Sequence, residues 1–226
     1  MGRFPRHAIA AGDQVTSDMI EELKRKAVHI GMGLWMFYPL FLERIPALMV
    51  VLFMLFLALF ILRPHVWGKA FDAIARPEDH GYRYLIGPLV YICAIGICVM
   101  SYPLFISAGS IGIMAFGDGF ATLVGKKWGR IRNPLDMNKT LEGTFAFILF
   151  AFLAVTLSFY FTAPITPKTD ILIVTATGAL IGAFVEMFPF EEHRGSGIFR
   201  RIIIDDNFFV PIVSGLAMYA IYQFYL

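Results

Sequence analysis

Charged residues and cysteine are both scarce in this chain, and each shortage excludes a class of protein. Asp, Glu, Lys and Arg make up only 16% of the 226 residues, while hydrophobic residues make up 58%. Soluble domains carry about 25% charged residues, so the composition excludes an ordinary water-soluble protein. The two cysteines, Cys93 and Cys98, lie five positions apart in one apolar stretch and face different sides of a helix. We therefore expect neither a disulfide framework nor a cysteine metal site.

Long apolar stretches recur along the whole chain. A bilayer core of about 30 Å needs roughly 20 apolar residues in a helix, and shorter stretches suffice when long side chains reach the interface. The sequence thus predicts an all-α, polytopic membrane protein with about seven transmembrane helices. These are expected near residues 27–42, 46–62, 84–102, 104–124, 145–162, 171–188 and 208–226.

The positions of lysine and arginine set the expected orientation. Seventeen of them fall in residues 1–26 and in every second loop, while the alternate segments carry only Arg44 and Lys168. Basic loops stay in the cytosol, so we expect a cytosolic amino terminus and a carboxyl terminus outside. Residues 1–26 are expected to form a charged cytosolic arm, and residues 27–226 a single transmembrane domain. A net charge of only +2 gives no support for a nucleic-acid partner.

The fourth predicted span contains an acid. Asp118 lies six residues before the cytosolic end of this span, which is about 9 Å along a helix. A charge at membrane depth is costly, so a functional role is the default interpretation of Asp118. Small residues on one stripe of the same span predict a close approach by another helix. They are Ala108, Gly112, Ala115, Gly119 and Thr122.

Further polar residues are expected at the same cytosolic level as Asp118, at the ends of other spans. They are His29, Glu142, Glu186, Asp205, Asp206 and Asn207. A secondary transporter is expected to hold its polar site near the bilayer midplane instead. A transporter or channel is therefore the less favoured interpretation.

A basic loop follows Asp118. It carries Lys126, Lys127, Arg130, Arg132 and Lys139. Lysine and arginine neutralise phosphate oxygens, and magnesium prefers one or two carboxylates together with phosphate oxygens and water. The loop and the neighbouring acids therefore predict a magnesium nucleotide site that performs phosphoryl transfer. An anchor to anionic membrane lipid is the alternative for these bases.

Nucleotide motifs of soluble proteins do not account for this loop. Gly117-x-Gly119 lacks the further glycine of a Rossmann turn and does not follow a strand. Gly125-Lys126-Lys127 lacks the upstream glycine and the Ser or Thr of a P-loop.

Three stretches together resemble the CTP-dependent polyprenol, phytol and diacylglycerol kinases, which include dolichol kinase. The central signature is Gly117-Asp118-Gly119-x-Ala121, Gly125-Lys126-x-x-Gly129-Arg130 and Lys139-Thr140-x-Glu142-Gly143-Thr144. Glu22-Leu23-Lys24-Arg25-Lys26-x-x-His29 and Ile204-Asp205-Asp206-Asn207-x-x-Val210-Pro211 are similar to the start and end of that family. The resemblance implies a multi-pass kinase that transfers the terminal phosphate of CTP, or another nucleotide, to a lipid alcohol.

The resemblance also implies roles for individual residues. Catalytic roles fall on Asp118, Lys139, Glu142 and Asp205. Nucleotide binding falls on Gly117, Gly119, Gly125, Lys126, Arg130, Lys139, Thr140 and Gly143. Asp118, Glu142 and Asp206 are expected to bind a divalent cation, which should be Mg²⁺. Further candidates are His29, Arg76, Glu78, Glu186 and Asn207. Which carboxylate acts as base and which binds metal stays open.

The nearest alternative enzyme is a phosphatidate cytidylyltransferase, which makes a CDP-lipid. Gly195-Ser196-Gly197 with Arg201 and Asp205 is distantly similar to its closing motif, but the Gly-Gly pair and the Asp-Arg-x-x-Asp spacing are absent. The expected partners are therefore a nucleotide, a lipid alcohol and membrane lipids, in the cell membrane of a prokaryote. The identity of the alcohol, the choice between CTP and ATP, and the oligomeric state stay open.

Overall fold

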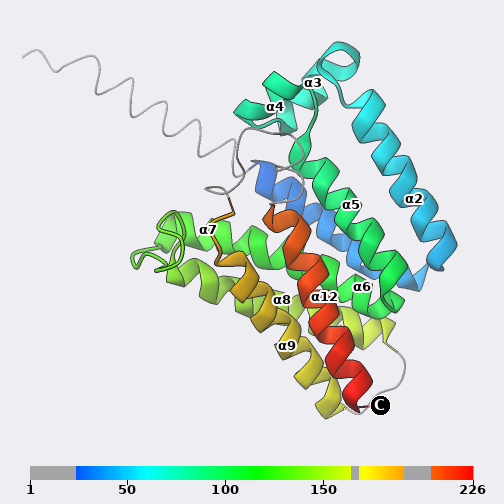
Figure 1. The fold of residues 1–226 in the computed structure, drawn as a ribbon, viewed down its shortest axis with the longest axis vertical. Helices are drawn as coiled ribbons and strands as arrows, with labels where there is room; N and C mark the ends of the chain where they lie inside the picture. The colour runs from blue at the N-terminus through cyan, green and yellow to red at the C-terminus, as the bar shows by residue number, and fades with distance from the viewer. Residues whose placement is uncertain (1–23, 164–167, 191–204, 226) are drawn as a thin grey trace, which may run out of the picture.

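The computed structural model describes residues 24–163, 168–190 and 205–225 (Figure 1). The described part is helical, without a β-strand apart from one isolated bridge between Arg132 and Thr140. In chain order its elements are a helix over residues 24–32 that continues as the 3-10 helix η1 (Gly33–Leu40), α2 (Arg44–Phe56), the π-helix η2 (Leu57–Ile61), α3 (Pro64–Ile74), α4 (Pro77–Tyr82), α5 (Ile86–Ser101), α6 (Leu104–Gly112), the π-helix η3 (Ile113–Asp118), α7 (Gly119–Trp128), α8 (Leu141–Thr162), α9 (Lys168–Glu186) and α12 (Asp206–Tyr225).

Four of the described helical segments are long and apolar enough to cross a membrane. They are Arg44–Ile61, Leu104–Trp128, Leu141–Thr162 and Asp206–Phe224, and Ile86–Ser101 is a shorter apolar helix. These helices confirm the predicted all-α class and fit an integral membrane protein. Seven spans, their orientation and the boundary at residue 27 stay predictions.

The first predicted span differs from a regular α-helix. Residues 24–32 are α-helical, but the chain then tightens into the 3-10 helix η1, which contains Pro39. A 3-10 helix rises about 2.0 Å per residue instead of 1.5 Å, so residues 24–40 extend over about 30 Å. This change of winding lets a short segment reach the thickness of a bilayer core.

The segment Leu104–Trp128 is the central helix of the bundle. It consists of α6, η3 and α7 without a break, and 83% of its most apolar window is buried inside the protein. η1, α8, α9 and α12 all contact it. By contrast, α2 packs against α5 at the edge of the bundle (Figure 1), with only 17% of its window buried.

Small residues let the first helix approach the central helix closely, as the stripe in the sequence predicts. A Cβ atom added to Gly33 would lie 2.7 Å from the Cβ of Ala115, and one added to Gly119 would overlap the side chain of Ile30. Such contacts leave no space for a larger side chain on either helix. The crossing fixes residues 24–32 beside Asp118.

We predict that Gly119→Val destabilises the protein, because the new side chain would occupy the space of Ile30. Forced overpacking of this kind costs about 1–3 kcal/mol. Thermal unfolding of the detergent-solubilised protein should show a midpoint several degrees lower. Adding Ile30→Ala in the same chain should restore part of the loss, and an unchanged midpoint for Gly119→Val alone would contradict the close crossing.

Candidate functional site

Asp118 is the last residue of η3 and is almost completely buried, with 6% of its surface exposed. The Nζ atom of Lys26 lies 2.5 Å from Asp118 Oδ2, and His29 Nε2 lies 3.5 Å from the same oxygen. His29 Nε2 also lies 3.3 Å from the backbone oxygen of Met114. A buried carboxylate needs such a partner, so the first helix supplies the charge that the central helix lacks.

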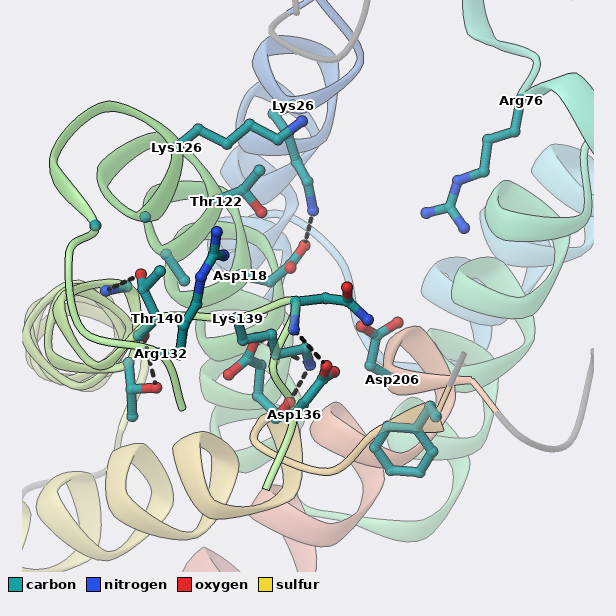
Figure 2. A pocket seen from close by; sticks show the side chains of 18 residues that line it. Lys26, Arg76, Asp118, Thr122, Lys126, Arg132, Asp136, Lys139, Thr140 and Asp206 are labelled. Atoms are coloured by element: carbon teal, nitrogen blue, oxygen red, sulfur yellow. Dashed lines mark hydrogen bonds and ion pairs between the residues drawn. The ribbon is translucent and has the colours of Figure 1, made fainter. Parts of the chain in front are cut away.

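A polar cavity of about 530 Å³ opens beside this ion pair. Figure 2 shows its labelled side chains, which come from the first helix, the end of η3, α7, the loop before α8, the start of α12 and, on the opposite side, Arg76 before α4. Five cationic side chains line it: Lys26, Arg76, Lys126, Arg132 and Lys139. Four carboxylates line it as well: Asp118, Asp136, Glu186 and Asp206. Charges of both signs therefore converge at one end of an otherwise apolar bundle.

The loop of residues 129–140 is closed at its base. The bridge between Arg132 and Thr140 joins its two arms, and Thr140 Oγ1 accepts a hydrogen bond of 3.2 Å from Gly143 N at the start of α8. This is a typical N-cap, which satisfies a free backbone donor of the helix. Asp136 is buried at the far end of the loop and accepts from Asn138 N at 2.9 Å. The loop thus holds its side chains in fixed positions.

Lys139 is fixed against α9. Its Nζ atom donates to the backbone oxygen of Glu186 and lies 3.1 Å from Glu186 Oε1. Burial lowers the pKa of Lys139, but the negative charges of Glu186 and Asp206 outweigh burial, so the net shift of the pKa is upward. The ammonium group therefore stays charged at neutral pH and is able to offset the charge of a phosphate.

Three glycines of the signature lie at the crossing of α7 and α8, where a larger residue would not fit. A Cβ atom on Gly143 would lie 2.9 Å from the backbone oxygen of Ala121, and one on Gly125 would lie 3.0 Å from Thr140 Oγ1. A Cβ atom on Gly129 would overlap the backbone of Gly125. These glycines allow the floor of the cavity to be made of closely packed backbone.

Nine residues assigned from the sequence line the cavity. They are Arg76, Asp118, Gly125, Lys126, Lys139, Thr140, Gly143, Glu186 and Asp206. Seven others are described but do not line it: Gly117, Gly119, His29, Arg130, Glu142, Asp205 and Asn207. Glu78 lies on α4, and its side chain is outside the described part of the structure.

The positions of the seven other residues follow from their contacts. Gly117 packs under the ring of Phe147. Asp205 Oδ1 accepts from the backbone and side-chain nitrogens of Asn207 at 2.9 and 2.8 Å, which fixes the start of α12. His29 and Asn207 instead line a neighbouring cavity.

Glu142 ties the basic loop to α8. Its Oε1 atom accepts from Arg130 N at 3.0 Å and from Ile131 N at 3.2 Å, and the side chain lies outside the cavity. The carboxylate therefore accepts hydrogen bonds from two backbone N–H groups at the start of the loop. In this structure Glu142 makes the contacts of a residue that positions the loop.

Several lining residues received no individual role from the sequence, although Arg132 was counted among the bases of the loop. They are Lys26, Ala121, Thr122, Gly129, Arg132, Asp136, Asn138, Thr144 and Phe190. Ala121, Gly129 and Thr144 lie within the quoted signature and Lys26 within the first motif, so position in a motif is a signal for these four. Asp136 and Asn138 reach the cavity only because the loop folds back, and no local pattern indicates that.

The donor set fits a magnesium ion that is bound together with phosphate. Within the described residues, no group of three or more His, Cys, Asp or Glu side chains is arranged to hold a metal ion. Asp118 and Asp206 nevertheless line one cavity with five cationic side chains. Magnesium typically takes one or two carboxylates and completes its shell with phosphate oxygens and water.

We predict that Glu142→Ala loosens the basic loop, because two backbone donors lose their acceptor. Amide hydrogen exchange in residues 130–140 should become severalfold faster, while exchange in α8 beyond its first turn stays unchanged. Glu43→Ala, at another exposed glutamate, is the matched control and should leave the loop unaffected. Equal protection of residues 130–140 in the wild type and in Glu142→Ala would rule out the positioning role.

Comparison with known proteins gives relatives that include phytol kinases and a farnesol kinase. The chain is 33% identical to the phytol kinase of Synechocystis sp. over 144 residues, which cover 61% of this chain and 55% of that protein. It is 27% identical to a probable chloroplastic phytol kinase of Zea mays over 230 residues, covering 93% and 71% of the two chains. It is also 27% identical to the chloroplastic farnesol kinase of Arabidopsis thaliana over 222 residues, covering 89% and 66%.

The matches cover only part of the length of the relatives. The chain spans about half the length of the first two, at 55% of the Synechocystis protein and 47% of a probable phytol kinase of Oryza sativa. No family model and no solved structure matches the chain. The resemblance read from the sequence is nonetheless confirmed: the chain is a homologue of proteins named phytol kinase and farnesol kinase, at 26–33% identity over much of its length.

Proposed function

We propose that the chain is a membrane kinase that transfers the terminal phosphate of CTP to the hydroxyl group of a prenol-type lipid alcohol. The observation that carries this proposal is the cavity in which five cationic and four acidic side chains converge at one end of an apolar helix bundle. A lipid alcohol reaches such a site from the membrane, and a nucleotide reaches it from water. The relatives named phytol kinase and farnesol kinase support a prenol as the acceptor.

The cations of the cavity suit a nucleoside triphosphate. Lys126 and Arg132 extend from α7 and the basic loop, and Arg76 extends from the opposite side (Figure 2). A cavity of about 530 Å³ lies within the range of small-molecule sites, roughly 300–1,000 Å³. We assign the phosphates to the space between these side chains and Lys139.

At phosphorus the reaction forms one bond and breaks one, and the alcohol also loses its proton. The oxygen of the alcohol attacks the terminal phosphorus, the bond from that phosphorus to the bridging oxygen breaks, and a nucleoside diphosphate leaves. Asp118 accepts the proton of the alcohol, while Lys139 and Arg132 stabilise negative charge on the phosphate oxygens. Asp206 is the cavity carboxylate that would hold Mg²⁺, which supplies further positive charge when bound.

The proposed topology has seven spans, a cytosolic amino terminus and the cavity at the cytosolic face. Two facts support it: basic residues alternate between loops, and the cavity draws its cations from the first helix, α7 and the loops that the count places on one side. The cell membrane of a prokaryote stays a prediction.

We predict that label from CTP distinguishes the proposed kinase from other enzymes. With Mg²⁺ and farnesol or phytol, the purified protein should transfer label from the terminal phosphate to the lipid and should not transfer label from the innermost phosphate. Transfer from the innermost phosphate to a phosphatidate acceptor would identify a cytidylyltransferase. Transfer to no alcohol, with either CTP or ATP, would overturn the kinase proposal.

We predict that Asp118→Asn removes activity without unfolding the protein. The amide keeps the shape of the side chain but cannot accept the proton, and loss of a general base typically costs about 10²–10⁴-fold in rate. Turnover should be measured beside the gel-filtration profile and the unfolding midpoint. Asp72→Asn, at an exposed aspartate of α3, is the matched control. Near-normal turnover of Asp118→Asn would end the case for Asp118 as a catalytic residue.

A further inference from the structure

A second cavity of about 270 Å³ lies next to the polar one. It is bounded by the first helix, η2 and α5, and most of its walls are apolar. Met32, Met54 and Ala58 are among the residues that line it. Its polar side chains include Lys26, His29 and Asn207. We name this cavity the apolar groove.

The apolar groove and the polar cavity meet. Lys26 and Arg76 line both of them. His29 lines the groove, and its Nε2 atom lies 3.5 Å from Oδ2 of Asp118, which lines the polar cavity. A molecule that enters the groove therefore reaches the acid that the proposed reaction uses.

A buried hydroxyl group in the groove has no partner within the described structure. Tyr91 lines the groove with only 5% of its surface exposed, and its hydroxyl oxygen has no hydrogen-bond partner. Its ring centroid lies 5.0 Å from that of His29, whose Nε2 atom contacts Asp118, so Tyr91 stands at the end of the groove nearest to Asp118. Buried polar groups in native proteins normally have a partner, which here points to a ligand. An alcohol fits, because its hydroxyl both donates and accepts.

The length of the groove limits what it holds. Met54 on α2 and Leu62, the residue that follows η2, both line it, and the eight residues from one to the other correspond to about 12 Å at the rise of an α-helix. The groove therefore takes the first part of one hydrocarbon chain, and the remainder lies among lipid tails beside α2, whose outer face is exposed. The volume of about 270 Å³ suits one chain segment of this length better than two segments side by side.

We propose that the apolar groove binds the proximal chain of a single-chain lipid alcohol, with the hydroxyl group placed between Tyr91, His29 and Asp118. This inference rests on the proposed kinase function and adds the place where the acceptor binds and the residues that position its hydroxyl group. Tyr91 is a positioning residue for the hydroxyl, and the methionines of the wall adapt to the branches of an isoprenoid chain.

Binding is tested separately from catalysis by a photoreactive farnesol analogue. After illumination in detergent, mass spectrometry should find the label in residues 54–62 and 88–92, and an excess of farnesol should abolish it. Gly87→Leu should block labelling, because Gly87 lines the groove and a Cβ atom there meets only the guanidinium of Arg76, at 3.9 Å. Gly81→Leu, at an exposed helical glycine with nothing within 4 Å, is the matched control and should keep it.

The results of this experiment test the proposed groove independently of the proposed kinase activity. Label outside these residues, or equal labelling of Gly87→Leu and the wild type, would overturn the groove whatever the enzyme does. Competed label in the groove without phosphate transfer to any alcohol would support the groove and overturn the kinase. Stronger competition by a diacylglycerol than by farnesol would overturn the single-chain assignment.

Kinetics test the role of Tyr91 in an active preparation. Tyr91→Phe should raise the KM for farnesol about five- to tenfold, the loss expected for one hydrogen bond, and should leave the KM for CTP unchanged. A purely structural role would change both constants together or lower the unfolding midpoint. An unchanged KM for farnesol would remove Tyr91 from the site.

Discussion

The ion pair between Lys26 and Asp118 constrains how the whole bundle is packed, because a buried carboxylate is unstable without a nearby cation. The two residues are 92 positions apart, so the first helix must lie directly against the central one. The glycines at positions 33 and 119 make that approach sterically allowed. The pair therefore links helix packing to the position of the acid that faces the polar cavity.

The two cavities give the bundle one polar end with two separate environments. Water-soluble phosphates suit the cavity between α7, α8 and α12, whereas a hydrocarbon chain suits the groove between the first helix, η2 and α5. Lys26 and Arg76 stand at their junction. A reaction between a nucleotide and a lipid needs this arrangement, since neither reactant is soluble where the other resides.

The sequence predicted the helices and much of the site, but it did not predict every contact. Charge spacing and apolar length are local signals that predicted Asp118 and Lys139 at the same level, and in the structure both line the polar cavity. Asp136 enters the cavity only through the folded loop, and Glu142 turns away from the cavity toward two backbone nitrogens. The 3-10 winding of η1 was likewise not predicted, because apolar length and charge spacing do not distinguish a 3-10 helix from an α-helix.

The π-helical turn η3 has a consequence for how related chains should be aligned. A π-turn contains one more residue than an α-turn, and one residue of an α-helix corresponds to a rotation of about 100°. The π-turn of residues 113–118 therefore accommodates one extra residue without rotating the α-helical residues on either side of it. A homologue that lacks a single residue here can form an α-turn instead and keep its aspartate on the same face, whereas the same gap within α6 or α7 would rotate one part of the helix against the other.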